Sequence, residues 1–384
     1  MRAARFDRRE LAGAVADVGV LVPIATALIV SNGLGATAVL LPAGLLYLLA
    51  AAAYGLPVPV QPLKAFGAIA IAKGLGSDAI AAGALLMGVI FLVLGRTGLI
   101  DLAARAFPRP LVRGVQLTVG LLFLKIAYEL VAEPPQAFRD HAGDPVLLFA
   151  AGLAVLALAM AMRSRPIALA LVGGGLAIAL ARAGGDLSLG PSAVELPQLD
   201  AATFVTALTV LVIPQLPLTF ANSCVATADA ARTYFGERAA RVRPGRLATT
   251  LGLANLLSGS IAGMPVCHGA GGMTAHRSFG ARTAGAPLAI GGVLLVLAVG
   301  LGAGLAVLLA AFPLPILAGM LAAAGVLHIG LLLDLEGVPS WALALLVGAV
   351  GFAFNLAVAL ALGLVLWWLA AAGLRLRRPA VQPR

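Results

Sequence analysis

The sequence predicts an all-α protein that crosses a membrane about fourteen times, built from two halves of seven spans in opposite orientations. Three observations support this fold class. Of the 384 residues, 61% are hydrophobic and only 11% are charged, whereas soluble proteins carry about 25% charged residues. Once the spans are numbered, nearly all cationic residues fall on one side of the membrane. Helix-breaking motifs also recur about 205 residues apart.

Apolar stretches follow one another along the whole chain, and their lengths suit membrane spans. The expected spans cover 11–30, 35–54, 57–75, 78–95, 110–131, 145–163, 166–182, 201–222, 244–262, 264–281, 284–311, 315–333, 339–353 and 355–374. Several are shorter than the roughly 20 residues that a full crossing needs, and the third and tenth are the most irregular. A short helix over 99–107 is expected at the membrane interface.

The positions of the charges set the orientation of these spans. With the N-terminus inside, 21 of the 26 Lys and Arg residues fall on the inner side, and only Lys73, Arg139 and Arg182 fall outside. This split follows the positive-inside rule, so both termini are expected in the cytoplasm and the protein in the inner (cytoplasmic) membrane. This distribution explains the net charge of +10 as a means of orienting the protein in the lipid bilayer, so no nucleic-acid partner is expected.

Other features limit the class of protein. No short apolar region with a cleavage site follows the basic start of the chain, so no cleavable signal peptide is expected. Cys224 and Cys267 lie in apolar stretches, so no disulfide framework is expected. Cys267, His268 and His276 lack carboxylate or cysteine company at metal-ligand spacing, so neither a metal site nor a cofactor is expected.

Two motifs repeat between the halves of the chain. "FPRPLVRGVQLTVG" (107–120) resembles "FPLPILAGMLAAAG" (312–325) at an offset of 205, and "PVQ" (59–61) resembles "PVC" (265–267) at an offset of 206. We therefore expect a first repeat over 1–183, an extracytoplasmic linker over 184–200 and an inverted second repeat over 201–384. In secondary transporters built this way, the substrate site lies near the midplane between interrupted helices. The alternative is a duplication that serves packing only.

The third span combines prolines with a lysine. "LPVPVQ" (56–61) cannot be helical, because proline lacks an N–H group and pushes the preceding residue toward an extended conformation. A half-helix is expected to begin at Pro62, with Gln61 as its N-cap and Lys64 in its first turn. A helix N-terminus at mid-membrane favours an anion, whereas a lysine there is unfavourable unless an anion also binds.

The tenth span supplies a counterpart. Extended "MPVC" (264–267) leads into His268, Gly269, Gly271 and Gly272, and glycines let backbone amides approach a ligand closely. By the offset, Cys267 occupies the position of Gln61. Two opposed half-helix N-termini with one cation suit a small oxyanion with several equivalent oxygens.

Each of these residues also has a purely structural interpretation. Lys64 could pair with a carboxylate inside the membrane, either Asp17 or Asp229. His268 could be a neutral packing or capping residue, Cys267 an apolar filler, and the glycines a surface for close helix packing. The sequence alone leaves these interpretations open.

The eighth span and its continuation, "IPQLPLTFANSCVATADAARTYFGER" (213–238), carry more polar residues than a lipid-facing helix tolerates. Thr219 and Asn222 are candidates to face the substrate. Asp229, like Asp17 in the first span, is a candidate for proton coupling. A surface salt bridge between Asp229 and Arg232 is the structural alternative.

Three segments carry a family resemblance over nearly the whole chain: "PVPVQPLKAFGAIA" (57–70), "PQLPLTFANSCVATADAARTYFGER" (214–238) and "GMPVCHGAGGMTAHRSFGART" (263–283). They resemble the MOT-type molybdate transporters, relatives of the sulfate permease (SulP) superfamily. The resemblance implies a seven-plus-seven inverted repeat divided into a core domain (spans 1–4 and 8–11) and a gate domain. The oxyanion site it implies lies at Gln61, Pro62, Lys64, Cys267, His268, Gly269, Gly271 and Gly272. Sulfate permeases end in a STAS domain, which is not expected here.

The main hypothesis is a secondary active transporter that imports molybdate or another tetrahedral oxyanion, with protons as the candidate coupling ion. A sulfate transporter and an anion channel are alternatives. So is a nucleobase permease of the same fold, although such a permease would be expected to carry a carboxylate in the tenth span, where there is none. No nucleophile, base and orienting group converge in any motif, so no enzyme is expected. The sequence leaves the oligomeric state open, a homodimer included.

Overall fold

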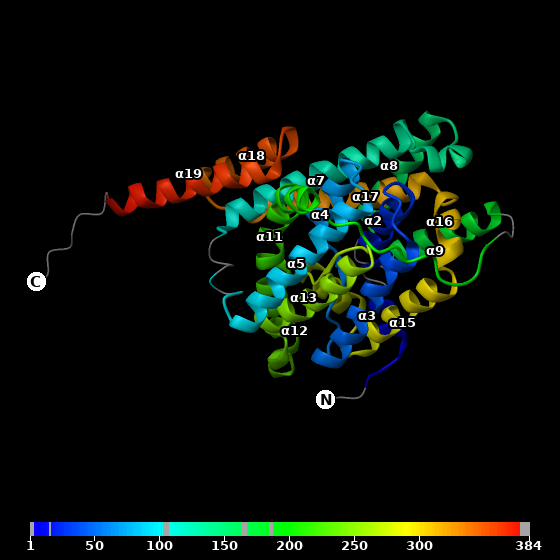
Figure 1. The fold of residues 1–384 in the computed structure, drawn as a ribbon, viewed down its shortest axis with the longest axis horizontal. Helices are drawn as coiled ribbons and strands as arrows, with labels where there is room; N and C mark the ends of the chain where they lie inside the picture. The colour runs from blue at the N-terminus through cyan, green and yellow to red at the C-terminus, as the bar shows by residue number, and fades with distance from the viewer. Residues whose placement is uncertain are drawn as a thin grey trace, which may run out of the picture.

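The computed structural model describes residues 4–14, 17–100, 102, 107–162, 167–183 and 187–376, most of which lie in helices (Figure 1). The helices of the first half are α1 (Arg8–Ala14), α2 (Val18–Val30), α3 (Ala36–Tyr54), α4 (Lys64–Ala72), α5 (Ser77–Thr97), α7 (Arg109–Ala132), α8 (Pro145–Ala161) and α9 (Ile167–Arg182). Those of the second half are α10 (Ala201–Thr206), α11 (Ile213–Leu218), α12 (Thr227–Phe235), α13 (Pro244–Ser260), α14 (Ala270–Phe279), α15 (Gly285–Gly300), α16 (Gly302–Ala310), α17 (Leu314–Gly330), α18 (Val338–Ala353) and α19 (Leu356–Leu376).

Every range expected as a span coincides with one or more of these helices. Within the described residues, six helical stretches are long and apolar enough to cross a membrane: Arg8–Val30, Ala36–Tyr54, Ser77–Thr97, Arg109–Ala132, Ala201–Arg241 and Leu314–Asp334. The bent pair of α15 and α16 would make a seventh, and several other apolar helices are shorter. The all-α membrane fold is therefore confirmed, whereas fourteen complete crossings remain a prediction. Most of the interfacial helix expected over 99–107 lies outside the described residues.

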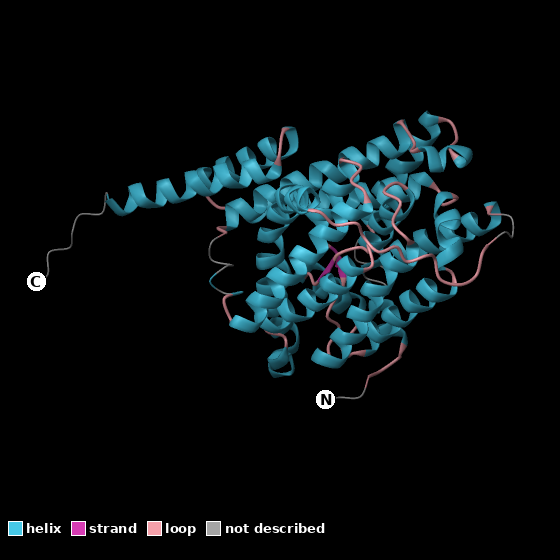
Figure 2. Ribbon diagram, in the orientation of Figure 1, coloured by secondary structure: helices cyan, strands magenta, loops and turns pink. Residues whose placement is uncertain are grey.

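The third and tenth spans are interrupted, as the prolines predicted. α4 has nine residues and α14 has ten, and extended chain precedes each of them. The extended segments contain β1 (Gln61–Pro62) and β2 (Val266–Cys267), which pair antiparallel. Figure 2 shows the two strands in the middle of the helical body, so non-helical backbone at this depth is enclosed by protein.

The eighth span differs from its expected bounds of 201–222. The helical path runs without a break from Ala201 to Phe235 and contains two π-helical stretches, Ala207–Val212 and Thr219–Ala226. Pro214 lies in α11, between these stretches, and Pro217 lies inside the same helix. Proline removes a backbone donor and clashes with the preceding turn. These effects account for the wider π-helical turns on either side of α11, which let the helix continue past both prolines.

The eleventh span, expected over 284–311, is bent by 97° between α15 and α16. The bend removes helical partners from the backbone of Gly300 and Ala303. Gly190, in the linker before the second half, replaces both of them. Its N–H donates to Gly300 O at 2.9 Å, and its carbonyl accepts from Ala303 N at 2.9 Å. The described part of the linker is therefore packed against the second half.

The packing of the helices follows the inverted repeat. α5 packs along α13, and α3 packs along α15. In the repeat α5 corresponds to α15 and α3 corresponds to α13, so the two contacts are equivalent. In the gate domain α18 packs on α7 and α8 packs on α17, a second pair related in the same way. α7 also packs on its own counterpart, α17, so the axis that relates the halves passes between these two helices.

Glycines at matching positions allow this central crossing of α7 and α17. A Cβ atom on Gly120 would lie 2.8 Å from the carbonyl oxygen of Gly325, and a Cβ on Gly325 would lie 2.8 Å from that of Gly120. Both residues belong to the motif that repeats at an offset of 205. The repeat therefore preserves a close backbone contact between the halves.

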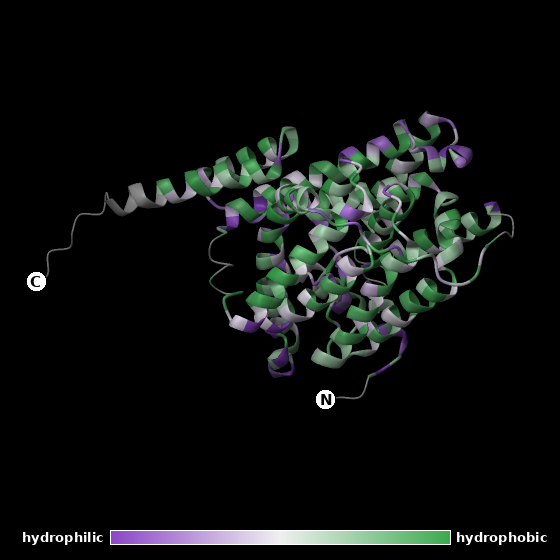
Figure 3. Cartoon of the chain, in the orientation of Figure 1, coloured by the Kyte–Doolittle hydropathy of each residue, from purple (hydrophilic) through white to green (hydrophobic). Residues whose placement is uncertain are grey.

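Polarity follows the membrane arrangement. In Figure 3 hydrophobic residues cover most of the helices, and hydrophilic residues gather mainly at helix ends and in connecting segments. A few polar side chains are nevertheless fully buried, among them Asp17, His268 and His276. Because a buried polar group is costly unless it is hydrogen-bonded, these residues mark the places where the fold has a specific polar contact.

Candidate functional site

The two short strands join the halves at equivalent positions. Gln61 lies opposite Cys267 and Pro62 lies opposite Val266. The repeat offset of 206 equates Gln61 with Cys267, so the axis that relates the halves passes between these two residues. Leu63 N donates to Pro265 O at 3.1 Å and extends the pairing by one further bond.

Side chains from neighbouring helices fix this irregular backbone. The Tyr47 hydroxyl of α3 shares its single proton between Asp17 Oδ2 and Val60 O, which lies 2.9 Å away. Asn255 of α13 accepts from Val266 N at 2.8 Å and donates to Val266 O at 2.9 Å. Since no helix satisfies these backbone groups, the side chains replace the missing partners and hold both strands in place.

The start of α4 corrects one prediction. The helix begins at Lys64 with Leu63 as its N-cap, two residues later than expected, and the Gln61 side chain makes no capping hydrogen bond. Pro62 takes part in the strand pair instead of opening the helix. Lys64 nevertheless stays in the first turn, and its Nζ donates to Gln61 Oε1 at 2.6 Å. These two side chains are therefore in direct contact.

The N-termini of both half-helices keep free backbone donors. At α4, Gln215 Oε1 of α11 accepts from Phe66 N at 3.0 Å. Within the described residues, the amides of Ala65, Gly271 and Gly272 meet no protein acceptor. Helix N-termini leave such donors unsatisfied and carry the positive end of the helix dipole. The arrangement is therefore suited to an anion.

Lys64 is half-buried, and among the described residues it forms no ion pair with any carboxylate. The direct pairing with Asp17 or Asp229 that the sequence left open is thus not observed. Gln61 lies between Lys64 and Asp17, because its Oε1 accepts from Lys64 and its Nε2 donates to Asp17 Oδ1. One amide therefore links the ammonium group to a buried carboxylate.

Asp17 is fully buried and satisfied by donors from three elements. Besides Gln61 Nε2, the Tyr47 hydroxyl donates to its Oδ2 at 2.7 Å, and His276 Nε2 of α14 lies 2.8 Å from the same oxygen. His276 is also fully buried, and its Nδ1 has no partner among the described residues. The cluster connects both halves of the repeat through one carboxylate.

The three glycines of the tenth span have different surroundings. A Cβ on Gly272 would lie 2.7 Å from Asp17 Oδ1 and 2.7 Å from Gln61 Nε2, so only glycine fits beside this cluster. A Cβ on Gly269 would lie 2.8 Å from Gln61 Oε1. Gly271 is exposed, with no atom near its Cβ position. A side chain at position 271 would therefore meet open space, so close packing does not require glycine there.

His268 and Cys267 both lie inside the core. His268 Nδ1 lies 2.8 Å from Pro59 O, and its Nε2 lies 3.0 Å from Thr250 Oγ1. Both ring nitrogens thus have protein partners, and the ring is fully buried. Cys267 Sγ donates to Pro62 O at 3.5 Å and is also buried. In this structure both side chains support the strand pair.

Asn222 is half-buried in the second π-helical stretch, and its Nδ2 would lie 3.6 Å from a Cβ on Gly269, so it borders the strand pair. Thr219 is buried one turn earlier, where its Oγ1 accepts from Gln215 Nε2 at 3.0 Å. Asp229 is exposed on α12 and shares no contact with the cluster around Asp17.

Sequence reasoning missed three contributors to this region. Tyr47 and Gln215 hold the extended segment before α4 and the N-terminus of α4, and His276 of α14 pairs with Asp17. A tyrosine hydroxyl or a histidine in an otherwise apolar span requires a buried partner, and that signal could have singled them out. No group of three or more metal-binding side chains gathers in the described ranges.

Comparison with known sequences finds relatives over most of the chain. Residues 9–123 and 207–327, more than half of the chain, match the family described as "Molybdate transporter of MFS superfamily". Molybdate transporter 1 of Arabidopsis thaliana is 32% identical over 363 residues, covering 84% of this chain and 79% of that protein. Molybdate transporter 1 of Chlamydomonas reinhardtii is 26% identical, covering 84% of this chain and 83% of its own length.

Solved structures share the fold. The transmembrane domain of the cyanobacterium bicarbonate transporter BicA matches with a TM-score of 0.64 at 20% identity, covering 96% of this chain and 98% of that one. The murine Solute Carrier 26 family member A9 anion transporter in its inward-facing state gives 0.66 at 14% identity, covering 97% and 69%. Both are inverted-repeat membrane folds. MFS proteins instead join two six-span halves as parallel repeats, so the superfamily word in the family description does not describe this fold.

Proposed function

We propose that this chain, which belongs to the molybdate transporter family, imports molybdate or a similar tetrahedral oxyanion as a secondary active transporter. The family makes it a membrane transporter and not an enzyme. The proposed substrate site lies between the N-termini of α4 and α14, with the gate helices α7 and α17 on its other side. The proposed location is the inner membrane with both termini in the cytoplasm.

One observation carries this proposal: an ammonium group without a carboxylate partner stands beside two half-helix N-termini with free amides. Lys64 is half-buried and Ala65 is fully buried, so the charge of the first and the open amide donor of the second are unfavourable without a ligand, and the exposed Gly271 adds a further free donor. An oxyanion would offset the charge and accept from the amides at the same time. Asn222 borders the same region and supplies a neutral amide to a further oxygen.

The same chemistry separates the candidate substrates. A neutral nucleobase would leave the ammonium without a counter-charge, and no carboxylate lies in the tenth span to hold its ring nitrogens. Sulfate shares the charge and shape of molybdate and differs mainly in size. Sulfate therefore remains the second candidate, and a binding competition has to rank the two.

We further propose that protons drive uptake through Asp17. It is the buried carboxylate next to the site, and the titratable groups around it are Tyr47, Lys64, Cys267, His268 and His276. A proton on Asp17 removes an acceptor from Gln61 Nε2, which allows the amide to turn and changes what it presents to Lys64. Asp229 is exposed and has no such link.

The decisive experiment is calorimetric binding of molybdate to the purified full chain, with tungstate, sulfate and uracil as competitors. We expect tungstate to displace molybdate about as well as molybdate itself, because both are tetrahedral dianions, and uracil not to compete. Displacement by uracil combined with indifference to tungstate would overturn the oxyanion assignment.

Coupling and direction need proteoliposomes. Inward uptake of labelled molybdate should rise when the outside is made acidic, and Asp17→Asn should keep molybdate binding but lose this stimulation. Stimulated uptake that survives in Asp17→Asn would exclude Asp17 as the coupling group. Asp229→Asn is the matched control and should behave as the wild type.

A further inference from the structure

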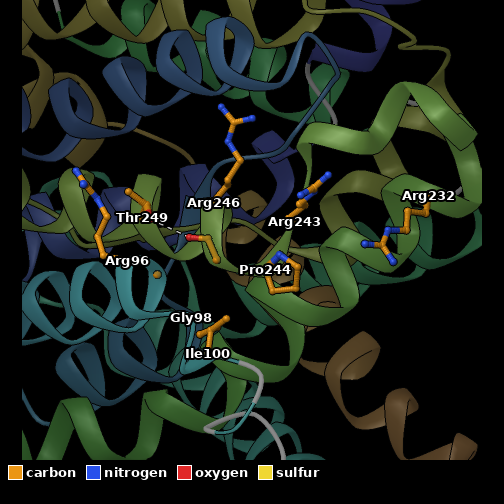
Figure 4. Close-up of a pocket in the computed structure, with 10 residues that line it drawn as sticks. Arg96, Gly98, Ile100, Arg232, Arg243, Pro244, Arg246 and Thr249 are labelled. Atoms are coloured by element: carbon orange, nitrogen blue, oxygen red, sulfur yellow. Dashed lines mark hydrogen bonds between the residues drawn. The ribbon is translucent and has the colours of Figure 1, made fainter.

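A second cationic region lies away from the proposed substrate site. A pocket of about 520 Å³ opens where the end of α5 meets the start of α13. Four arginines line it: Arg96 from α5, Arg232 from α12, and Arg243 and Arg246 at the start of α13 (Figure 4). The positive-inside count predicts that this end of the molecule faces the cytoplasm.

Two glycines bring the arginines together. A Cβ on Gly95 would lie 2.7 Å from the carbonyl oxygen of Gly245 and 2.6 Å from Thr249 Oγ1, so the backbones of α5 and α13 touch here. Arg96 and Arg246 directly follow these two glycines in the sequence. The close contact between α5 and α13 therefore brings Arg96 and Arg246 near each other and concentrates positive charge there.

The pocket holds no counter-charge in the part of the chain that the structure describes. Arg96, Arg232 and Arg246 are exposed and make no ion pair there, and Arg243 donates from its Nε to Ala240 O at 2.8 Å. Arg243 is the N-cap of α13, Arg246 lies in its first turn, and that turn has no acidic residue. Cations at a helix N-terminus oppose its dipole, so a bound anion would stabilise this arrangement.

Apolar side chains continue from the pocket toward the membrane interior. Val89 and Val93 of α5 are 52% and 51% exposed, and Leu253 of α13 is 45% exposed. Val93 lies one turn before the end of α5, and Leu253 lies one turn beyond Thr249, which lines the pocket. A ligand with a phosphate group and acyl chains would match both regions at once.

We propose that this pocket binds the phosphate group of an anionic ligand, supplied by the headgroup of a phospholipid at the cytoplasmic surface. The arginines contact the phosphate and the acyl chains lie along α5 and α13. A soluble phosphate would use the same arginines but would leave the apolar strip unused. This inference rests on the orientation proposed above and does not depend on which anion the protein transports.

The test uses the purified full chain in detergent and three probes: phosphatidylglycerol, phosphatidylcholine and inorganic phosphate. Binding is followed by native mass spectrometry of retained lipid and by the shift of the melting temperature. The variant is Arg96→Gln/Arg246→Gln, because neither side chain has a protein partner within the described ranges. The control is Arg8→Gln/Arg9→Gln, which removes two exposed arginines from the same predicted side.

We expect phosphatidylglycerol to bind more tightly than phosphatidylcholine. The pocket variant should weaken phosphatidylglycerol binding about twenty-five-fold, since each of the two arginines contributes about fivefold. The control pair should change binding far less. If inorganic phosphate displaces phosphatidylglycerol at millimolar concentration, the phosphate site stands but its natural ligand is a soluble anion. Equal phosphatidylglycerol binding by the wild type, the pocket variant and the control would overturn the proposal. Should the double variant not fold, each single variant is measured against the same control.

Discussion

Lys64→Met tests whether the ammonium group binds the substrate. Methionine keeps most of the length of the side chain but removes the charge and the donor. The structure gives Lys64 a single protein partner, Gln61 Oε1 at 2.6 Å, and no ion pair among the described residues. Loss of the protein contact should therefore lower the free energy of unfolding by only about 1 kcal/mol, the net value of one hydrogen bond.

The expected effect on molybdate binding is larger. A charge-assisted hydrogen bond to the oxyanion contributes about 1.5–3 kcal/mol. Its loss corresponds to a dissociation constant about ten- to a hundredfold higher. Lys64→Arg should restore only part of this affinity, because a planar guanidinium group does not place its donors where a compact ammonium does.

The measurement is calorimetric affinity together with the melting temperature in detergent. Lys73→Met is the matched control, because Lys73 is the exposed C-cap residue of the same short helix. It should change neither quantity. A well-folded Lys64→Met protein that binds molybdate like the wild type would show that Lys64 is not a ligand and that backbone amides hold the anion alone.

Three further predictions concern stability and use the melting temperature as the readout. His276→Ala should destabilise the protein by about 3–5 kcal/mol, because it leaves a buried carboxylate without one of its partners. Gly120→Ala should cost about 1–3 kcal/mol, since its new methyl group meets Gly325 O; Gly292→Ala, with nothing nearby, should be neutral. Thr250→Val should cost about 1–3 kcal/mol because a buried ring nitrogen loses its partner, while molybdate affinity stays unchanged.

The controls use residues of the same type in open surroundings. His141→Ala and Thr209→Val alter exposed side chains and should leave the melting temperature nearly unchanged. A destabilisation of His141→Ala equal to that of His276→Ala would show that the buried pair contributes nothing special. A loss of molybdate affinity in Thr250→Val would argue that His268 does more than support the strand pair.

The sequence predicted the features of the site that depend on local chemistry. Pro57 and Pro59 lie two residues apart and disfavour a helix over this stretch in any tertiary context, so the break before α4 could be predicted without knowledge of the fold. The position of Lys64 in the first turn of the half-helix could be predicted for the same reason, since it lies only three positions after Gln61. The repeat offset further identified which segment of the second half would lie opposite.

The features that sequence reasoning missed depend on contacts between distant segments. The helix begins at Lys64 because Pro62 pairs with Val266, and a tertiary contact of this kind overrides the preference of proline for a first helical position. Asp17, Tyr47 and His276 come from three different helices, so no spacing in the sequence could reveal that they meet. The sequence correctly marked Asp17 as unusual but could not name its partners.

Gln61 gives the proposed substrate site and the proposed coupling group a physical connection. The oxygen of its side-chain amide accepts from Lys64, and the nitrogen donates to Asp17. An oxyanion that draws the ammonium away from Gln61 releases the oxygen of the amide. A proton that arrives on Asp17 releases the nitrogen. Coupling between two ligands is reciprocal. If a proton on Asp17 changes the affinity for the anion by some factor, the bound anion changes the affinity of Asp17 for the proton by the same factor. The direction of that change decides whether proton and anion move together. The molybdate affinity of the wild type measured at two pH values reports it, and Asp17→Asn, which lacks the titrating group, should lose the difference.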